Sequence, residues 1–267
     1  MLKYSFMTFA CPEYSLKEVI DAAVRYRYDG VEPRVVEGHK HGIELGLTES
    51  QRAEVRRRFE EANIAVACIA TSVRFNRPEQ AERDEMVAQV KAYCELAADL
   101  RCPRIRVFGG HAEDHPDHAT VISRVVACLR ECEEHAQDCG VSICLETHDD
   151  FSAGADVAVV CSILDSPWIR VAWDVQHPIT AGEDIAVTAS MLMPYIEHVH
   201  FHDTDRTEGK NDCVPIGQGQ APLSRFLDVF KKHNYKGFLS GEWFYNNGPE
   251  VDLAHYITAL RAMEPPD

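Results

Sequence analysis

Residues 141–177 read VSICLETHDDFSAGADVAVVCSILDSPWIRVAWDVQH. Two short runs in this stretch, Val141–Glu146 and Ile169–Asp174, are rich in β-branched residues and predict strands. The longer segment between them has apolar residues at the three- and four-residue spacing of a helix. Each predicted strand ends on a carboxylate, where an apolar residue would ordinarily finish it. The stretch therefore predicts a strand–helix–strand unit with acidic side chains at the strand ends.

The same alternation of short β-rich runs and longer helical segments continues along all 267 residues. A doubly wound sheet usually has fewer strands and a Gly-rich phosphate turn, and the sequence contains neither GxGxxG nor GxxxxGK[ST]. We therefore predict an α/β fold in which residues 1–267 form a single domain, a (β/α)₈ TIM barrel. The predicted strands are Tyr4–Phe9, Gly30–Val35, Ile64–Ala70, Arg104–Phe108, Val141–Glu146, Ile169–Asp174, Ile196–Phe201 and Gly237–Glu242.

Local signals predict where helices begin and end. Helices are expected to start after Ser15, at a capping box formed by Thr48 and Gln51, and at Pro222. Glycines are expected to close helices and open the next strand. These glycines are Gly30, Gly140 and Gly237. The longest irregular segments all follow predicted strands and therefore belong at the C-terminal rim of the barrel. They are Glu37–Gly46, Phe75–Gln80, Gly109–Pro116 and Thr204–Pro222.

The composition limits the classes of partner. The chain has 43 acidic and 27 basic residues and a formal net charge of −16, which disfavours nucleic acid as a partner. No apolar run approaches the roughly 20 residues that cross a bilayer, and the first residues lack the features of a signal peptide. We therefore expect a cytoplasmic protein with no membrane contact. A homo-oligomer is compatible with the sequence, but no apolar face demands one.

The ten cysteines do not form a recognisable metal or disulfide pattern. No CxxC is present, and most of the cysteines fall inside apolar strand or helix patterns. A chain of this size has enough core to fold without disulfides. We therefore expect buried, reduced thiols that act as small hydrophobic residues.

The chemistry is concentrated at the ends of the last four predicted strands. These ends read CLETH (144–148), VAWDVQH (171–177), HVHFHD (198–203) and SGEW (240–243). Because strand side chains alternate, Glu146, Asp174, His200 and Glu242 are expected to point at one small volume. Three carboxylates cannot lie together in ionised form without a cation. An oxygen-rich set with one imidazole suits one divalent metal ion, Mn²⁺, Mg²⁺, Co²⁺ or Zn²⁺.

Each of these residues also has a structural explanation when taken alone. Asp174 could simply cap the next helix, and a strand-end glutamate is most often an exposed loop residue. His198 lies one step deeper than His200 and is expected to be a hydrogen-bonded core histidine. The coincidence on four adjacent strands favours the metal site over these separate explanations.

These strand ends resemble those of the xylose isomerase-like, or endonuclease IV-like, superfamily of TIM barrels. The superfamily includes ketose 3-epimerases, hydroxypyruvate isomerases, inosose isomerases and inosose dehydratases. Its metal set of two glutamates, one aspartate and one histidine maps onto the four residues just named. The resemblance also implies substrate contacts by His177 in DVQH and by Arg206 in HFHDTDR. His148 and His111 are two further candidates for substrate contact.

Two more segments carry the resemblance. GVEPR, residues 30–34, resembles the family's second strand, where a Glu or Arg can approach the substrate. VPIGQGQAPL, residues 214–223, resembles the family's rim loop with a G-x-G turn.

The resemblance implies a metal-dependent isomerase or epimerase that acts on a small carbohydrate, a ketose or polyol-derived ketone. The mechanism that the resemblance implies is proton transfer through a metal-bound cis-enediolate, which would form when one of the catalytic pair, Glu146 and Glu242, removes a proton beside the carbonyl. The other glutamate returns a proton. No Lys/Arg cluster for a substrate phosphate stands out at the rim, which favours a non-phosphorylated substrate.

Three alternatives remain. The same metal and bases would serve an inosose-type dehydratase, in which the enediolate eliminates water. An endonuclease IV-like nuclease needs a further His after the third strand and an Asp-x-His after the seventh. The corresponding segments, ATSVRFN (70–76) and DTDRTEGKND (203–212), contain neither, although His111 and His177 would match two of its extra ligands. A non-catalytic sugar-binding barrel would not need two opposed glutamates.

Overall fold

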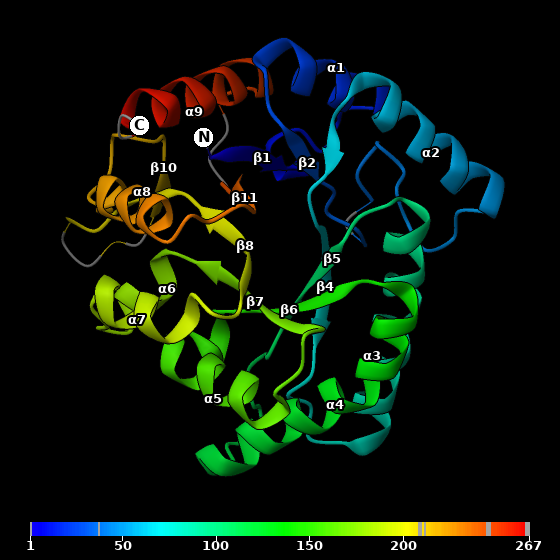
Figure 1. Ribbon diagram of the computed structural model, residues 1–267, viewed down its shortest axis with the longest axis vertical. Coiled ribbons are helices and arrows are strands. Elements are labelled where there is room, and N and C mark those ends of the chain that lie inside the picture. The colour runs from blue at the N-terminus through cyan, green and yellow to red at the C-terminus, as the bar shows by residue number, and fades with distance from the viewer. Residues whose placement is uncertain (1, 37, 208–209, 211, 244–246, 265–267) are drawn as a thin grey trace.

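In the computed structural model, parallel strands form a barrel and the helices lie in a ring around it (Figure 1). The structure describes residues 2–36, 38–207, 210, 212–243 and 247–264. Glu37 and residues 208, 209 and 211, which belong to two of the predicted rim segments, lie outside the described residues. The predicted (β/α)₈ barrel is confirmed.

Nine strands in the described part of the chain build the barrel sheet, in the order β3-β2-β1-β11-β8-β7-β6-β5-β4. The strands β6, β7, β8 and β11, which lead to the four candidate metal ligands, are consecutive in this order. Their positions therefore bring the last four βα repeats together along one arc of the barrel. The bounds are β1 Lys3–Met7, β2 Gly30–Glu32, β3 Ala65–Val66, β4 Ile69–Arg74, β5 Arg104–Phe108, β6 Ser142–Glu146, β7 Ile169–Asp174, β8 Ile196–Phe201 and β11 Phe238–Gly241.

The third predicted strand, Ile64–Ala70, is interrupted in the structure, and this break makes nine strands out of eight repeats. Its two parts are β3 and β4, and β4 continues past the predicted end to Arg74. The ring closes at this point because Arg34, just after β2, forms a bridge with Ala70 on β4. The Ala70 backbone N–H donates to the Pro33 carbonyl at 3.0 Å.

The helices follow the strands as the alternation predicts. Ser15 and Thr48 cap α1 and α2, and each forms a capping box with the residue three positions later. The helix bounds are α1 Leu16–Tyr26, α2 Glu49–Ala62, α3 Gln80–Asp99, α4 His118–Cys139, α5 Gly154–Leu164, α6 Gln176–Thr180, α7 Ile185–Leu192, α8 Leu223–Lys232 and α9 Pro249–Met263.

Two connections differ from the prediction. The segment after β7 contains two helices, because Gly182 takes φ 91° after α6 and the Asp184 side chain then caps α7. The segment Thr204–Pro222, predicted to be irregular, contains most of a two-stranded antiparallel hairpin. This hairpin consists of β9, Asp203–Asp205, and β10, Asp212–Val214.

The predicted helix ends at glycine are correct only for Gly140, which closes α4 with φ 65°. α1 instead ends at Arg27, which has φ 62°, and α2 ends at Asn63, which has φ 54°. Gly30 opens β2 as predicted, whereas Gly237 directly precedes β11, and Asn234 has a positive φ of 53° just after α8. Residues with side chains larger than glycine therefore take the left-handed conformation at these helix ends.

The main hydrophobic core lies between the sheet and the surrounding helices. Trp173, buried on the outer face of β7, contacts the rings of Phe226 and Phe230 on α8, with centroids 5.4 and 5.5 Å away. Inside the barrel, by contrast, several fully buried side chains are polar, including Arg106 and His198. A barrel interior is ordinarily filled with branched apolar residues, so this polar interior indicates a functional site.

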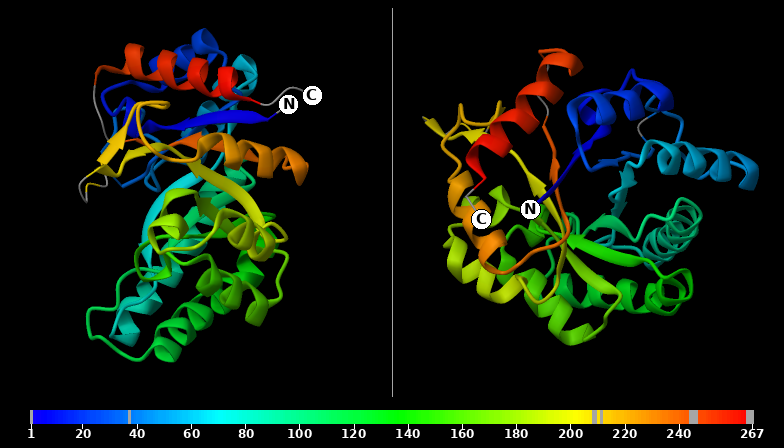
Figure 2. Two further views of the ribbon diagram at one scale, coloured as in Figure 1. Left: turned by 90° about the vertical axis from the view of Figure 1, so that its left-hand side faces the viewer. Right: turned by 45° about the horizontal axis from the view of Figure 1, so that its top comes forward.

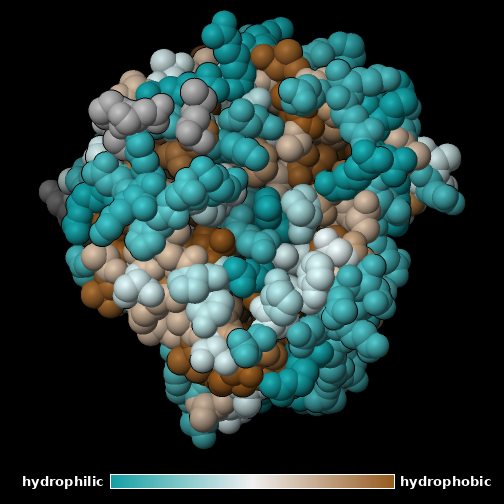
Figure 3. All heavy atoms as spheres, viewed as in Figure 1, coloured by the Kyte–Doolittle hydropathy of each residue, from teal (hydrophilic) through white to brown (hydrophobic). Residues whose placement is uncertain are grey.

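Hydrophilic side chains cover most of the face seen in Figure 3. Among the described residues, no helix is both long enough and apolar enough to cross a membrane. All ten cysteines are free thiols, and eight of them are buried.

Candidate active site

Four side chains converge at the C-terminal end of the barrel, which we call the mouth. Glu146 and Asp174 are the last residues of β6 and β7, His200 is on β8, and Glu242 directly follows β11. Each offers a ligand atom, and these atoms all lie within 4.8 Å of one another. We call Glu146, Asp174, His200 and Glu242 the quartet.

His200 lies at the centre of the contacts within the quartet. Its Nδ1 is 2.6 Å from an oxygen of Glu146 and 2.9 Å from an oxygen of Glu242. Its Nε2 faces the other way and lies 3.0 Å from Glu32 at the end of β2. His200 and Glu146 are completely buried, and Glu242 is 8% exposed. The imidazole therefore directs one nitrogen into the quartet and the other away from it.

Asp174 is held in place by contacts from its own and neighbouring elements. Its Oδ1 accepts a hydrogen bond from the Gln176 backbone N–H at 2.8 Å. His202 Nε2 lies 3.0 Å from Oδ2. The backbone of Asp174 is fixed by Thr147, whose hydroxyl accepts from the Asp174 N–H at 2.9 Å and lies 3.1 Å from the Asp174 carbonyl. These contacts orient the carboxylate before any ligand binds.

Arg106 is a site residue that the sequence analysis missed. This buried side chain on β5 places its Nε 3.2 Å from Oε2 of Glu146. Its NH1 donates to the Thr71 carbonyl at 2.6 Å, and its guanidinium lies 4.0 Å from the centre of the Phe108 ring. The only sequence signal is a charge within the run RIRVF, at a position that alternation turns inward.

Burial and mutual attraction shift the pKa values in the quartet. Burial would raise the pKa of Glu242, but His200 lowers it to about 2. Burial would likewise raise the pKa of Asp174, but His202 and His177 lower it well below its usual range. Burial would lower the pKa of His200, yet Glu242, Glu32 and Glu146 raise it well above its ordinary value. The carboxylates therefore favour a positive charge at Nδ1 of His200.

The quartet fits a divalent metal ion. Oε2 of Glu146 is buried and has no hydrogen-bond partner, although Arg106 lies nearby. Three carboxylates and one imidazole nitrogen are an oxygen-rich donor set of the kind that Mn²⁺, Mg²⁺, Co²⁺ or Zn²⁺ accepts. The negative charge of the surrounding carboxylates, which favours a proton on His200, would also favour a bound metal ion.

Two of the predicted substrate contacts lie together beside the quartet. The rings of His148 and His177 are 4.3 Å apart between centroids. Nδ1 of His148 lies 2.8 Å from Asp149, and Nε2 of His177 is 3.9 Å from Asp174. His111, also predicted, has a 68% exposed side chain, and its Nε2 lies 3.2 Å from Asp149. Asp149 therefore joins two of the three histidines.

Arg206, the fourth predicted substrate contact, is turned toward α6. Its NH2 donates to the side chains of Gln176 and Thr180 at 2.8 and 3.2 Å. It also donates to the Gln176 carbonyl at 3.3 Å. In this arrangement Arg206 fixes the start of α6, the helix that carries His177.

Comparison with known proteins places the chain in a family. The family model for the xylose isomerase-like TIM barrel matches residues 20–263, and the chain belongs to this family. This confirms the family predicted from the strand ends. No curated protein sequence matches the chain.

Several solved structures share the fold at low sequence identity. The IOLI protein with a bound zinc atom is 18% identical, with a TM-score of 0.83 over 98% of this chain and 96% of that chain. The 3-keto-D-glucoside 4-epimerase YcjR from E. coli is 16% identical, with a TM-score of 0.81 over 98% and 100%. The probable 3-DHS dehydratase AsbF from Bacillus anthracis is 18% identical, with a TM-score of 0.79 over 97% and 99%.

Proposed function

We propose that this protein is a divalent-metal-dependent isomerase or epimerase of a ketose or polyol-derived ketone. The observation that carries the proposal is the quartet, in which two glutamates from different strands approach the same nitrogen of His200. Membership of the xylose isomerase-like family supports it, and so do the epimerases among the proteins of similar fold.

The quartet would hold the metal ion through one atom each of Glu146, Asp174, His200 and Glu242. When bound, the ion would act as a Lewis acid that polarises the carbonyl of the substrate. The buried position of the quartet strengthens every electrostatic interaction made there.

The two glutamates would transfer the proton. One removes the proton from the carbon beside the carbonyl, and the other returns a proton to the resulting enediolate. Return on the opposite face of the same carbon gives an epimer, and return on the adjacent carbon gives an isomer. His148 and His177, which pack against each other beside the quartet, would donate hydrogen bonds to substrate oxygens as negative charge develops.

The first experiment measures metal content and proton exchange. The purified protein is expected to bind one divalent ion per chain. A panel of ketoses and inososes is then incubated with the metal-loaded protein in D₂O, and NMR detects deuterium at the carbon beside the carbonyl. Glu146→Gln and Glu242→Gln should each lower the exchange rate at least about 100-fold, the lower range for loss of a general acid or base.

Glu134→Gln is a matched control, because Glu134 is an exposed residue of α4 and is not a member of the quartet. It should exchange at the rate of the unmodified protein. Loss of water from the substrate instead of epimer or isomer formation would contradict the proposal and assign the site to a dehydratase. Absence of both metal and exchange would contradict an enzymatic function at this site.

A further inference from the structure

Glu32 is a buried carboxylate that contacts two imidazoles at once. Its Oε1 lies 3.0 Å from Nε2 of His200, and its Oε2 lies 2.8 Å from Nε2 of His198. All three side chains have no exposed surface. Each oxygen of Glu32 is therefore within hydrogen-bonding distance of a different imidazole nitrogen.

This arrangement decides which nitrogen of His200 can bind a metal ion. A carboxylate oxygen accepts a hydrogen bond from an N–H group, so in the 3.0 Å contact with Glu32 the proton lies on Nε2 of His200. In the neutral ring the lone pair is then on Nδ1, the nitrogen 2.6 Å from Glu146. Carboxylates that accept from the second nitrogen of a metal-binding histidine fix its tautomer and raise its basicity.

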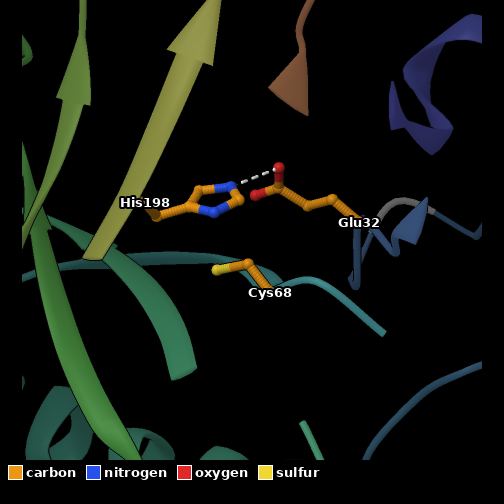
Figure 4. Close-up of side chains that lie close together, drawn as sticks. All are labelled: Glu32, Cys68 and His198. Atoms are coloured by element: carbon orange, nitrogen blue, oxygen red, sulfur yellow. Dashed lines mark hydrogen bonds and ion pairs between the residues drawn. The ribbon is translucent and has the colours of Figure 1, made fainter. Parts of the chain in front are cut away.

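Glu32 also belongs to a second group of possible metal ligands, with Cys68 and His198. Figure 4 shows these side chains pointing toward one another, with the His198 imidazole hydrogen-bonded to Glu32. Their ligand atoms lie within 4.8 Å of one another. Burial raises the pKa of the Cys68 thiol well above its ordinary value, and a metal ligand must be the thiolate. Glu32 has already committed both oxygens to imidazoles, so this group is poorly suited to a metal ion.

We infer that Glu32 is a positioning residue that orients His200 and keeps its Nδ1 free to bind the metal ion. His198 acts with it, because its hydrogen bond fixes the second oxygen of Glu32. The inference rests on the metal-dependent function proposed above and adds a carboxylate that touches neither the metal nor the substrate. It links the second strand of the barrel to a site otherwise built from the last four βα repeats.

Glu32→Gln tests the inference directly. A glutamine amide has one accepting oxygen and one donating NH₂ group, so it cannot accept from both imidazoles. Metal affinity should fall by about 10- to 100-fold, the range found when such supporting carboxylates are changed. The readout is the dissociation constant of Co²⁺, followed by its visible absorption in the metal-free protein without any substrate.

Cys68→Ala is the matched control, because Cys68 is equally buried beside Glu32 but is not hydrogen-bonded to either imidazole. This variant should bind Co²⁺ within about twofold of the unmodified protein while losing stability, since it leaves a small cavity. Urea unfolding of both metal-free variants separates a loss of stability from a loss of metal affinity. A Cys68→Ala protein that binds less metal per chain would overturn the inference in favour of the Glu32–Cys68–His198 group.

A spectroscopic measurement on the unmodified protein tests the role of Glu32 even if Glu32→Gln does not fold. Long-range ¹H–¹⁵N spectra of the zinc-loaded protein should show the His200 proton on Nε2 and the metal on Nδ1. Zinc on Nε2, or unchanged Co²⁺ affinity in Glu32→Gln, would overturn the role of Glu32 but leave the proposed function intact. Failure of the unmodified protein to bind any divalent ion would instead overturn the proposed function, and the role of Glu32 with it.

Discussion

Asp149 shows how single residues stabilise the mouth. It takes a left-handed backbone conformation, with φ 53°. Its carboxylate lies 2.8 Å from His148, 3.2 Å from His111 and 3.4 Å from Arg74. Burial would raise the pKa of Asp149, but these three neighbours, His148 foremost, lower it to about 2. A strained backbone position therefore coincides with a strongly favoured negative charge.

This depressed pKa predicts a pH-dependent contribution to stability. A carboxyl group with a lower pKa in the folded state stabilises the fold above its unfolded pKa, near 3.9. The contribution is lost as the pH falls through the folded value of about 2. Asp149→Asn should therefore lower the free energy of unfolding at pH 5 by roughly 2 kcal/mol, and by less at pH 2. Urea unfolding at several pH values measures this.

Asparagine suits the test because it tolerates the left-handed conformation. Asp228→Asn provides the control, since Asp228 is an exposed residue of α8. The difference in the free energy of unfolding between Asp149→Asn and the unmodified protein should shrink as the pH falls. If it did not, the ion pairs around Asp149 would not be the source of the stability.

At the scale of elements, Asp203 organises the rim segment between β8 and α8. The residue is only 1% exposed, and both of its oxygens accept backbone hydrogen bonds. Oδ1 accepts from Thr204 and Ala221 at 2.8 and 3.1 Å, and Oδ2 accepts from Gly217 and Gly219 at 2.8 and 2.9 Å. A Cβ on Gly219 would lie 2.3 Å from Oδ1. The G-x-G turn thus lets the backbone approach the carboxylate.

Asp203→Asn should loosen this segment. An amide cannot accept four hydrogen bonds, and its NH₂ group would face backbone donors. We expect the free energy of unfolding to fall by about 2 kcal/mol, as for lost hydrogen bonds to a charged group. Hydrogen exchange of the Gly217 and Gly219 amides should become faster.

Asp205→Asn, at the other end of β9, is the matched control, because the Asp205 side chain contacts Thr207 and Lys210, two nearby described residues of the same segment. Equal protection of the two glycine amides in all three proteins would show that Asp203 does not anchor the segment.

The sequence predicts the presence of the strands and helices better than the residues at which they begin and end. β-rich runs separated by helical spacing locate all eight repeats, because burial on both faces of a parallel strand leaves a clear apolar run. The interruption between β3 and β4 carries no signal, since Ala67 and Cys68 are as apolar as the rest of the run. The helix end at Arg27 could not be predicted, because the left-handed conformation costs an arginine roughly 1–2 kcal/mol and only the rest of the fold offsets this cost.

The candidate site, too, could be predicted from the sequence only in part. The quartet could be predicted because every member lies at or next to the end of a strand, where an acidic or imidazole side chain is conspicuous. Arg106 could not be predicted, because its partner Glu146 is far from it in the sequence and only the barrel brings them together. The orientation of Arg206 depends on Gln176, a contact that no local pattern encodes.

For the whole molecule, the polar barrel interior predicts that a metal ion bound at the quartet would stabilise the fold. Arg106 is the one fully buried guanidinium that we find beside the quartet among the described residues. The negative charges of Glu146, Glu242 and Glu32 raise its pKa, although burial alone would lower it. Buried carboxylates destabilise a fold unless positive charges compensate for them, so a cation bound at the quartet would add stability. A ligand that binds only the folded state raises the free energy of unfolding by mass action.

Mn²⁺ should therefore stabilise the protein. At a free concentration 100 times its dissociation constant, the free energy of unfolding should rise by about 2.7 kcal/mol. Mn²⁺ is preferred to Zn²⁺ for this measurement, because ten cysteines in the unfolded chain would bind the softer ion. Urea unfolding with and without a chelator provides the measurement.

Glu242→Gln serves as the comparison and should lose most of the stabilisation. Equal stabilisation of this variant and the unmodified protein would mean that Mn²⁺ binds somewhere other than the quartet.

The first strand and the last helix meet at the end of the barrel opposite the mouth. The Leu2 backbone N–H and the Tyr4 hydroxyl both donate to the Glu264 carboxylate, at 3.1 and 3.2 Å. Figure 2 shows the start of β1 close to the end of α9. An affinity tag or a fused reporter joined before Leu2 or after Glu264 would therefore leave the barrel at the end away from the mouth. Tethering the protein to a surface by such a tag would leave the mouth open to solution.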